Sequence, residues 1–329
     1  MKVLVTGANG FLGAWLTKKL LDEGHQVKAL VRKNSDLSEL SNCKPQFALG
    51  DVTDRNSLLE NFKDQEIIFH LAGVISYKKK DRQLMETVNV DGTKNVIAAC
   101  TALETPMLLH LSSVVTVGST FKPEVQSEIS PYKIHHLDLG YFETKRKAER
   151  LVLDAARDKK IQAICVNPST IYGFGDAKKG SRKNQVKVAR GELGFYTAGG
   201  VNVVSVKDVV DGVLLAIKKG RLGERYILSS ENMTIESLFQ KIAAAAGVKP
   251  PGWLIPAWTL HALGIAGDTL NRLGFQAQLS QENAYTATMF HWFDHTKAQR
   301  ELGYNPRPAD EAIENSVRWM KDNGYLSEK

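Results

Sequence analysis

A tyrosine and a lysine four residues apart form the first pair in this chain whose types and spacing could do chemistry. They are Tyr141 and Lys145, in the segment Y-F-E-T-K. On a helix, positions i and i+4 share one face with Cβ atoms about 5–6 Å apart, so the ammonium can approach the phenol. A nearby cation favours the phenolate and lowers the pKa of a tyrosine below its usual value near ~10. The pair therefore predicts a tyrosine that works as acid and base, although chance also produces this spacing on solvated helices.

A serine upstream could share a substrate with this tyrosine. A strand expected over residues 107–112 ends at Ser113, which leaves room for a loop before a helix that begins near Leu137. The serine hydroxyl could donate a hydrogen bond to a substrate carbonyl oxygen while the tyrosine protonates that oxygen. The alternative is that Ser112 and Ser113 only form a turn at the strand end.

The amino-terminal segment M-K-V-L-V-T-G-A-N-G-F-L-G predicts a site for the pyrophosphate of a dinucleotide. A short β-branched strand is followed by Gly7, Gly10 and Gly13 and by a helix expected over Leu12–Asp22. Glycine permits a tight turn and a close backbone approach, and amides at the start of a helix attract phosphate. The spacing is G-x-x-G-x-x-G rather than the commoner G-x-G-x-x-G. An ordinary glycine-rich turn is the alternative.

Two cations follow the second strand, which we expect over Gln26–Val31. They are Arg32 and Lys33, at a place where NAD-binding folds usually have an acid that holds the ribose 2′-hydroxyl. A guanidinium there can bind a 2′-phosphate through two hydrogen bonds, so the sequence predicts NADP(H) rather than NAD. The alternative is that both are solvated loop charges in a basic protein.

Two further strands should end at the same crevice, because ligands bind beyond the carboxyl ends of the strands in open parallel sheets. One ends at Asp51, whose carboxylate could accept a hydrogen bond from the adenine amino group. The other ends in Ala72 and Gly73, whose small size would leave room for ribose and phosphates. Asp51 could instead begin a turn or cap the next helix, a role that suits Asp54 better.

The elements that must position these residues alternate between strand and helix up to residue 168. Helices expected at Leu12–Asp22, Met85–Leu103 and Leu137–Arg157 would cover both faces of a parallel sheet with right-handed crossovers. The sequence predicts an α/β fold, a doubly wound parallel Rossmann sheet with a smaller, mostly helical C-terminal domain that binds substrate. The expected domains are an NADP-binding domain over 1–168 with a returning segment around 201–228, and a substrate-binding domain over 169–200 and 229–329.

Aromatic residues are concentrated in the carboxyl-terminal half. They include Trp253, Trp258, Tyr285, Trp292 and Phe293. An apolar substrate pocket is one interpretation. We favour the other, that they form the core of the smaller domain, because Trp and Phe mostly serve packing.

Composition indicates an ordinary globular enzyme subunit. Of the 329 residues, 43% are hydrophobic and 24% are charged. No apolar run approaches the about 18 residues of a membrane span, and the first strand begins at residue 2, so we expect a cytoplasmic protein without a membrane partner. Cys43, Cys100 and Cys165 are scattered without metal spacing, and neither a disulfide nor a metal is expected.

The net charge of +7 raises the question of nucleic acid. The densest basic run is Lys78-Lys79-Lys80 with Arg82, in a loop that lacks the interleaved aromatic residues that base stacking needs. We therefore expect no nucleic-acid partner. The excess positive charge suits an enzyme that attracts an anionic cofactor.

As a set, these motifs resemble the extended short-chain dehydrogenase/reductase family, also described as the NAD-dependent epimerase/dehydratase family, and its dihydroflavonol-4-reductase-like branch in particular. The motifs are T-G-A-N-G-F-L-G, G-D-V-T-D, H-L-A-G, N-V-D-G-T, S-S-V-V-T-V-G, Y-F-E-T-K and N-P-S-T-I-Y-G-F-G-D, and the resemblance spans nearly the whole chain. It implies Ser113, Tyr141 and Lys145 as catalytic residues, and a homodimer through the helices near Met85 and Leu137. The cofactor contacts that it implies, with the glycines and cations described above, are Gly7, Gly10, Phe11, Leu12, Gly13, Arg32, Lys33, Asp51, Val52, Leu71, Ala72, Gly73, Tyr141, Lys145 and Pro168.

Two departures from the family pattern narrow the expected reaction. Asn167 precedes Pro168 where the family often has arginine, and Val114 follows the catalytic serine where sugar-nucleotide dehydratases of the family carry an acid. Dehydration is therefore disfavoured, and Arg32 argues against the tightly held NAD of the family's epimerases. We expect NADP(H)-dependent reduction of an aldehyde or ketone, or oxidation of an alcohol, on a small-molecule substrate. The alternatives are an NAD(P)-dependent nucleotide-sugar epimerase and a non-catalytic scaffold that senses the cofactor.

Overall fold

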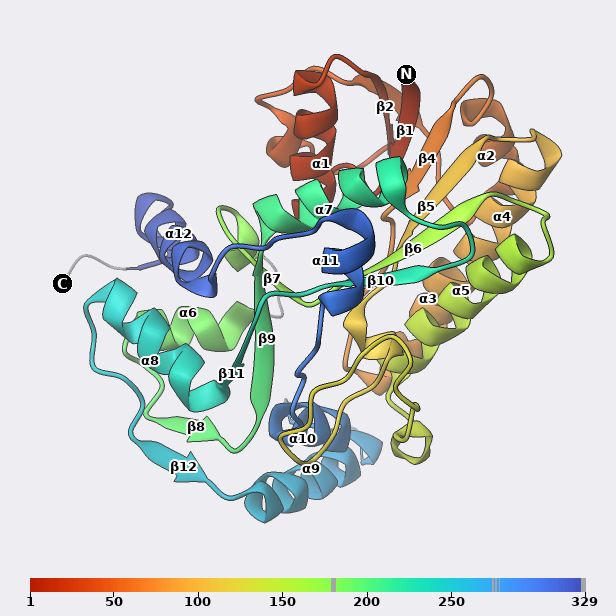
Figure 1. Cartoon of the computed structure of the whole chain (residues 1–329). Coiled ribbons are helices and arrows are strands. Elements are labelled where there is room, and N and C mark those ends of the chain that lie inside the picture. The colour runs from red at the N-terminus through yellow and green to blue at the C-terminus, as the bar shows by residue number, and fades with distance from the viewer. Residues whose placement is uncertain (179–181, 274, 276, 278, 327–329) are drawn as a thin grey trace.

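The computed structural model describes residues 1–178, 182–273, 275, 277 and 279–326. Within them, a sheet of seven strands runs through the amino-terminal part (Figure 1). All neighbouring strands pair in parallel, so the predicted doubly wound sheet is confirmed. In spatial order the strands are β10 (Arg225–Leu228), β6 (Ala163–Pro168), β5 (Met107–Leu111), β4 (Ile67–His70), β1 (Lys2–Thr6), β2 (Gln26–Val31) and β3 (Gln46–Leu49).

Helices cover both faces of this sheet, because successive side chains of each strand point to opposite faces. In β1, Val3 and Val5 join the core beneath one set of helices, whereas Leu4 joins the core beneath the other. The first set is α1 (Phe11–Asp22), α7 (Val206–Lys219) and α11 (Thr296–Leu302). The second set is α2 (Arg55–Asn61), α4 (Gly92–Ala102) and α5 (Gly140–Arg157).

The helix expected over Met85–Leu103 is interrupted. A short α3 (Arg82–Met85) leads into a π-helical segment, Glu86–Asp91, before α4 begins. The side chain of Asn89 in this segment accepts a hydrogen bond from Val74 N at 2.7 Å and donates to Val74 O at 2.9 Å. These tertiary bonds hold the widened turn against the loop that follows β4.

The helix expected from Leu137 begins later, at Gly140. A 3-10 turn at His135–Leu137 ends at Asp138, whose φ of 48° lies in the left-handed region. The chain must leave this conformation before α5 can start.

The remaining elements form the carboxyl-terminal part, on the left and lower side of Figure 1. A small sheet of β11 (Glu231–Thr234), β9 (Gly200–Ser205) and β7 (Thr170–Tyr172) shares a core with α6 (Lys183–Ala189), α8 (Ile235–Ala246) and α12 (Ala309–Asp322). Below it lie β8 (Phe195–Thr197), β12 (Trp253–Ile255), α9 (Ala257–Arg272) and α10 (Gln281–Thr288). The division into two domains stays a prediction.

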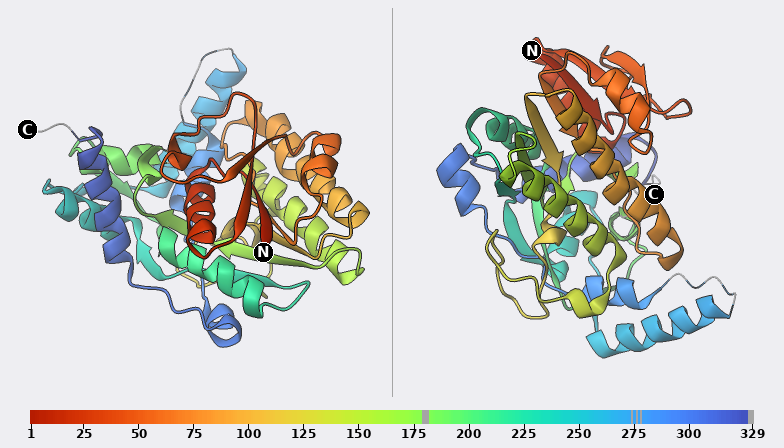
Figure 2. Two further views of the ribbon diagram at one scale, coloured as in Figure 1. Left: turned by 90° about the horizontal axis from the view of Figure 1, so that it is seen from above. Right: turned by 90° about the vertical axis from the view of Figure 1, so that its right-hand side faces the viewer.

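The aromatic residues of this part do not share one role. Phe293 is buried, and the indole of Trp292 donates to Met233 O at 3.0 Å. Trp253 and Trp258, in contrast, are exposed, so the expectation that they belong to the core is wrong. The buried residues of α9 are Leu260, Gly264 and Gly267, and Trp258 lies on the other side of the helix. The right-hand view of Figure 2 shows α9, in light blue, along the lower edge of the molecule.

Candidate active site

The glycine-rich turn lies where the order of strands reverses, between β1 and β4. Gly7 has a φ of 69°, and a Cβ there would lie 2.8 Å from Ala72 N. A Cβ on Gly13 would lie 2.1 Å from Gly7 O. Both contacts are with backbone, which cannot move aside, so glycine is required at these positions. The predicted pyrophosphate turn and the end of β4 are thus brought together.

The first turn of α1 faces the same crevice. Gly10 precedes the helix in extended conformation and supplies no side-chain cap, while its amide donates to Gly7 O at 3.0 Å. Phe11 and Leu12 begin the helix with buried side chains. A helix start without a side-chain cap is suited to an anionic group such as a pyrophosphate.

The adenosine end of the predicted cofactor site lies beyond β2 and β3. Arg32 and Lys33 follow β2 directly and are exposed. The carboxylate of Asp51 accepts hydrogen bonds from the amide and the hydroxyl of Thr53, both at 2.9 Å. Asp51 therefore begins a turn, as the alternative interpretation of the sequence predicted. Its contact with adenine stays a prediction. Val52 beside it is buried.

Ser113, Tyr141 and Lys145 are brought together by β5 and α5. Ser113 follows β5, and its side chain lies close enough to the phenol of Tyr141 to lower the pKa of that phenol. Lys145 lies one turn after Tyr141 on α5, and its Nζ donates to Leu111 O at the end of β5 at 2.7 Å. Tyr141 and Lys145 are each only 7% exposed, so the ammonium is largely withdrawn from water. The predicted nicotinamide contact, Pro168, is buried at the end of neighbouring β6.

The pKa of Tyr141 is raised, whereas the sequence predicted that Lys145 would lower it. Burial raises the pKa of this phenol, the nearby Tyr77 raises it further, and the hydrogen bond with Ser113 lowers it. Lys145 is not among the groups that shift the pKa of Tyr141, so the expected lowering by this lysine is not found. A neutral phenol in this position is a proton donor, as the reductive direction requires.

The lysine itself is shifted toward neutrality. Burial lowers the pKa of Lys145 to about 8, and the charges of Glu149 and Cys165 act in the opposite direction. Lys145 is therefore charged below about pH 8 and loses its proton above it. The ammonium depends on an acid that lies one further turn along α5.

That acid, Glu149, is a functional candidate that was missed from the sequence. It is buried, and its carboxylate accepts hydrogen bonds from Thr116 Oγ1 at 3.0 Å, from Arg225 Nη1 at 2.9 Å and from Asn167 Nδ2. Asn167 Nδ2 also donates to Ser113 O at 3.1 Å. Glu149 thus supports both the serine loop and the lysine. Its position four residues after Lys145 was the one available signal.

We expect Glu149→Gln to shift the alkaline limb of the kcat–pH profile to lower pH. Glu149 raises the pKa of Lys145, so removing its charge lowers that pKa, and the ammonium is lost at lower pH. The folded state should also lose about 2 kcal/mol, because Arg225 loses its buried anionic partner. Turnover against pH and the urea unfolding midpoint measure the two effects.

Asp154→Asn is the matched control, since Asp154 is a half-exposed acid on the same helix. It should leave both quantities unchanged. An unmoved alkaline limb in Glu149→Gln, with stability lowered, would mean that Glu149 is only structural.

A second missed acid, Glu282, connects α10 to the start of the catalytic helix. Its buried carboxylate faces the backbone amides of Gly140 and Tyr141, which lower its pKa, although burial raises the pKa overall. Arg82 Nη2 lies 3.7 Å from its Oε2. Glu282 thereby compensates for the lack of a side-chain cap at Leu139, and nothing in the local sequence indicated this.

The surroundings of Tyr141 are mostly apolar and aromatic. Its ring meets Tyr77 edge-on with centroids 6.1 Å apart, and both belong to a cluster that includes Tyr285. Tyr285 in turn lies 6.2 Å from Phe121 and 5.0 Å from His261, between ring centroids. These residues come from the loops after β4 and β5 and from α9 and α10. A substrate that reaches Tyr141 meets hydrocarbon surfaces from both parts of the chain.

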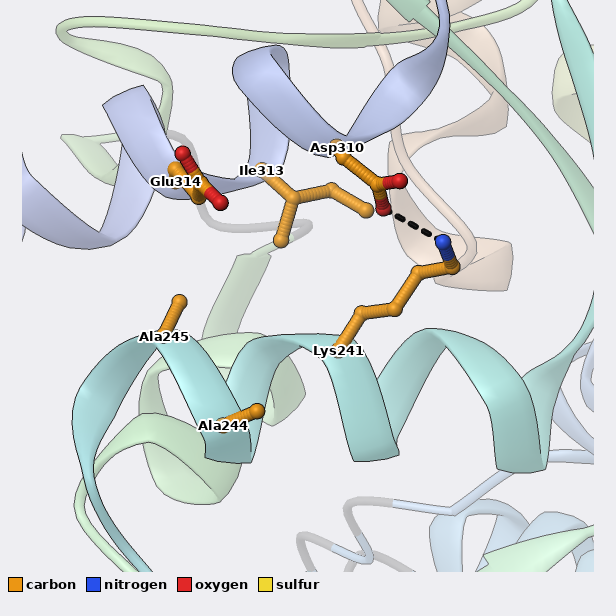
Figure 3. Close-up of a pocket in the computed structure, with 6 residues that line it drawn as sticks. All are labelled: Lys241, Ala244, Ala245, Asp310, Ile313 and Glu314. Carbon is orange, nitrogen blue, oxygen red and sulfur yellow. Dashed lines mark hydrogen bonds and ion pairs between the residues drawn. The ribbon is translucent and has the colours of Figure 1, made fainter.

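We also searched the described residues for a metal site, for other pockets and for a membrane-spanning helix. In the part of the chain that the structure describes, no group of three His, Cys, Asp or Glu side chains could hold a metal ion. A surface pocket between α8 and α12 is bounded by Lys241, which pairs with Asp310 across it (Figure 3). It contains none of the predicted catalytic residues. Within the same described residues, no helix has the length and apolar character to cross a bilayer.

Known proteins are similar to nearly the whole length of this chain. Residues 4–225 match the model of the 3-beta hydroxysteroid dehydrogenase/isomerase family. The chain is 30% identical over 335 residues to sterol demethylase protein B of Methylococcus capsulatus, with 99% of this chain and 100% of that protein covered. It is 29% identical over 328 residues to a Synechocystis sp. protein provisionally named dihydroflavonol 4-reductase, with 98% and 95% covered. The solved structure of gox2253 is 32% identical, with a TM-score of 0.89 and 99% of both chains covered.

Proposed function

The chain belongs to the 3-beta hydroxysteroid dehydrogenase/isomerase family of extended short-chain dehydrogenases/reductases, and from this membership we propose that it reduces the carbonyl of a bulky, mostly apolar substrate with NADPH. The predicted resemblance is confirmed, and with it the class of nicotinamide-dependent oxidoreductases. The choice of NADP(H), the substrate class and the residue roles are our proposal.

In the proposed reaction, a hydride adds to the carbonyl carbon and a proton adds to the carbonyl oxygen. When bound, NADPH supplies the hydride that adds to the carbonyl carbon. Tyr141 donates its proton to the carbonyl oxygen, and Ser113 holds that oxygen by a hydrogen bond. Lys145, whose Nζ lies at the end of β5, would hold the ribose of the nicotinamide.

The observation that carries the proposal is that Ser113 and a buried Tyr141 lie together at the carboxyl edge of the sheet, near enough for the serine to lower the pKa of the phenol. The two residues after the serine are Val114 and Val115, both buried. They cannot supply the acid that water elimination needs, which supports reduction over dehydration.

The substrate class rests on the apolar surroundings of Tyr141 and on the names of two relatives. Those names refer to sterols and to a dihydroflavonol, which are polycyclic and bulky. A cluster that contains Tyr77 and Tyr285 around the reacting phenol suits such a ring system.

A consumption assay tests the proposal. We expect NADPH oxidation with a 3-keto steroid or a dihydroflavonol, and little with NADH. A nucleotide sugar that is converted without cofactor consumption, by protein carrying tightly bound NAD, would favour the epimerase alternative. Protein that binds NADPH but converts none of these substrates would favour the scaffold.

Arg32→Ser should reverse the cofactor preference. An exposed guanidinium that binds a 2′-phosphate contributes a charge-assisted interaction of about 1.5–3 kcal/mol, so kcat/KM for NADPH should fall about 10- to 100-fold. The value for NADH, which has no 2′-phosphate, should not fall. Arg318→Ser on α12 is the matched control for loss of an exposed arginine. Equal losses with both cofactors would contradict the assignment of Arg32.

Two expectations about the whole protein stay predictions. The homodimer through α4 and α5 and the cytoplasmic location have no direct test in the structure.

A further inference from the structure

Helix α9 exposes most of its large apolar side chains to solvent and turns its small residues toward the protein. Trp258 and Ile265 within α9 and Leu273 directly after it are 73%, 60% and 69% exposed. Leu263 and Leu270 are about half exposed. At 100° per residue these five side chains occupy one continuous side of the helix, with Ala262 and Ala266 between them.

The opposite side of α9 is built for close contact with the protein. A Cβ on Gly267 would lie 2.0 Å from Leu279 O, and one on Gly264 would lie 3.0 Å from Ser280 O. The glycines therefore let the helix backbone pack directly against the start of α10. This packing fixes the orientation of α9, so the outward apolar side is not a consequence of a loosely held helix.

The strand that precedes α9 also has exposed apolar side chains. Trp253 and Leu254 of β12 are 79% and 52% exposed. We call the set Trp253, Leu254, Trp258, Leu263, Ile265, Leu270 and Leu273 the α9 face. Contiguous apolar surfaces of this kind mark interaction sites on soluble proteins. Figure 2 shows α9 at the periphery of the molecule, away from the large sheet.

Positive charges border the α9 face. Lys79 Nζ donates to Asp268 Oδ2 at 2.7 Å, which places the run Lys78 to Lys80 beside α9. Asp268 is the one acid of this helix and is neutralised by that contact, while Arg272 in the last turn is exposed. The border is thus cationic.

We propose that the α9 face docks on the surface of a membrane that contains anionic phospholipids. Leucine and isoleucine would enter the acyl boundary, the two tryptophans would lie at headgroup level, and the lysines would meet lipid phosphate. This departs from the expectation of no membrane partner, which was drawn from the lack of a long apolar run. The docking brings the aromatic residues near Tyr141 to the bilayer, since His261 of α9 contacts Tyr285.

The charges favour a bilayer over a second copy of the chain. A two-fold interface through α9 would pair the apolar side with itself and supply no anion for the lysine run, whereas lipid phosphate would pair with it. The elements predicted to form the homodimer, α4 and α5, are different ones.

Sedimentation of the full-length protein with vesicles tests the proposal. We expect binding to vesicles of phosphatidylcholine with phosphatidylglycerol, weaker binding to phosphatidylcholine alone, and release by salt. The double variant Trp258→Ser, Ile265→Ser should bind at least about 10-fold more weakly, with unchanged thermal stability and NADPH affinity. Leu222→Ser, which removes an exposed leucine elsewhere, should bind normally.

Two results would overturn the proposal. One is wild-type protein that stays in the supernatant with anionic vesicles. The other is a concentration-dependent dimer that the double variant abolishes, in protein that does not bind vesicles, because a second copy would then cover the face. Neither result depends on which carbonyl the enzyme reduces, so failure here is distinguishable from failure of the proposed reaction.

Discussion

Tyr141→Phe is expected to lower kcat about 1,000-fold and to leave NADPH affinity within a few-fold of normal. The substitution removes only the hydroxyl that we assign as proton donor, and positioned general acids typically contribute about 10²- to 10⁴-fold. The ring is buried against Tyr77, and phenylalanine keeps these contacts. Single-turnover kinetics and a fluorescence titration with NADPH measure the two quantities separately.

Tyr304→Phe provides the matched control. Tyr304 is also buried, and among the described residues its hydroxyl has no hydrogen-bond partner. It lies in the core beneath α7 and α11, so its loss should leave kcat unchanged. Near-normal turnover in Tyr141→Phe would remove this tyrosine from the mechanism.

Ser113→Ala is expected to lower kcat about 100-fold, as the loss of one hydrogen-bond donor to a developing oxyanion typically does. A second effect has the same sign. The hydrogen bond with Ser113 lowers the pKa of Tyr141, so its removal makes the phenol a weaker acid. NADPH affinity should stay near normal, because the assigned role of Ser113 is toward the substrate.

The neighbouring serine makes a sharp comparison. Ser112 is buried, and its Oγ lacks a hydrogen-bond partner within the described part of the chain. Ser112→Ala should therefore retain full turnover. If the two alanine variants lost activity equally, the effect would come from the strand end as a whole and not from the Ser113 hydroxyl.

The large sheet was predictable because its determinants are local. Short β-branched runs form the strands, and the requirement for glycine at Gly7 and Gly13 is visible in their spacing before the close contacts are known. The juxtaposition of Ser113, Tyr141 and Lys145 then follows from the rule that parallel strands end at one edge. The structure brings these three together, while their roles stay predictions.

What the sequence did not reveal depends on partners far along the chain. In the sequence, Glu149 resembles any other acid on a helix. Its role depends on hydrogen bonds from Asn167 of β6 and Arg225 of β10. The interruption of the helix at Glu86–Asp91 depends on the bonds that Asn89 makes with Val74. Local propensity contains no information about either contact.

The error at Trp253 and Trp258 has a different cause. Hydrophobicity tells how favourable burial would be, but not which side of a helix another element covers. On α9 the glycines decide this, because they allow the closest approach to α10.

The transfer of deuterium from NADPH to product tests the central proposal most directly. The cofactor would be labelled at C4 of the dihydronicotinamide and supplied with whichever ketone the wild-type enzyme consumes. We predict one deuterium on the carbinol carbon for each NADPH oxidised, with transfer about 1,000-fold slower in Tyr141→Phe. Product that contains no deuterium, formed without net oxidation of NADPH, would contradict net carbonyl reduction.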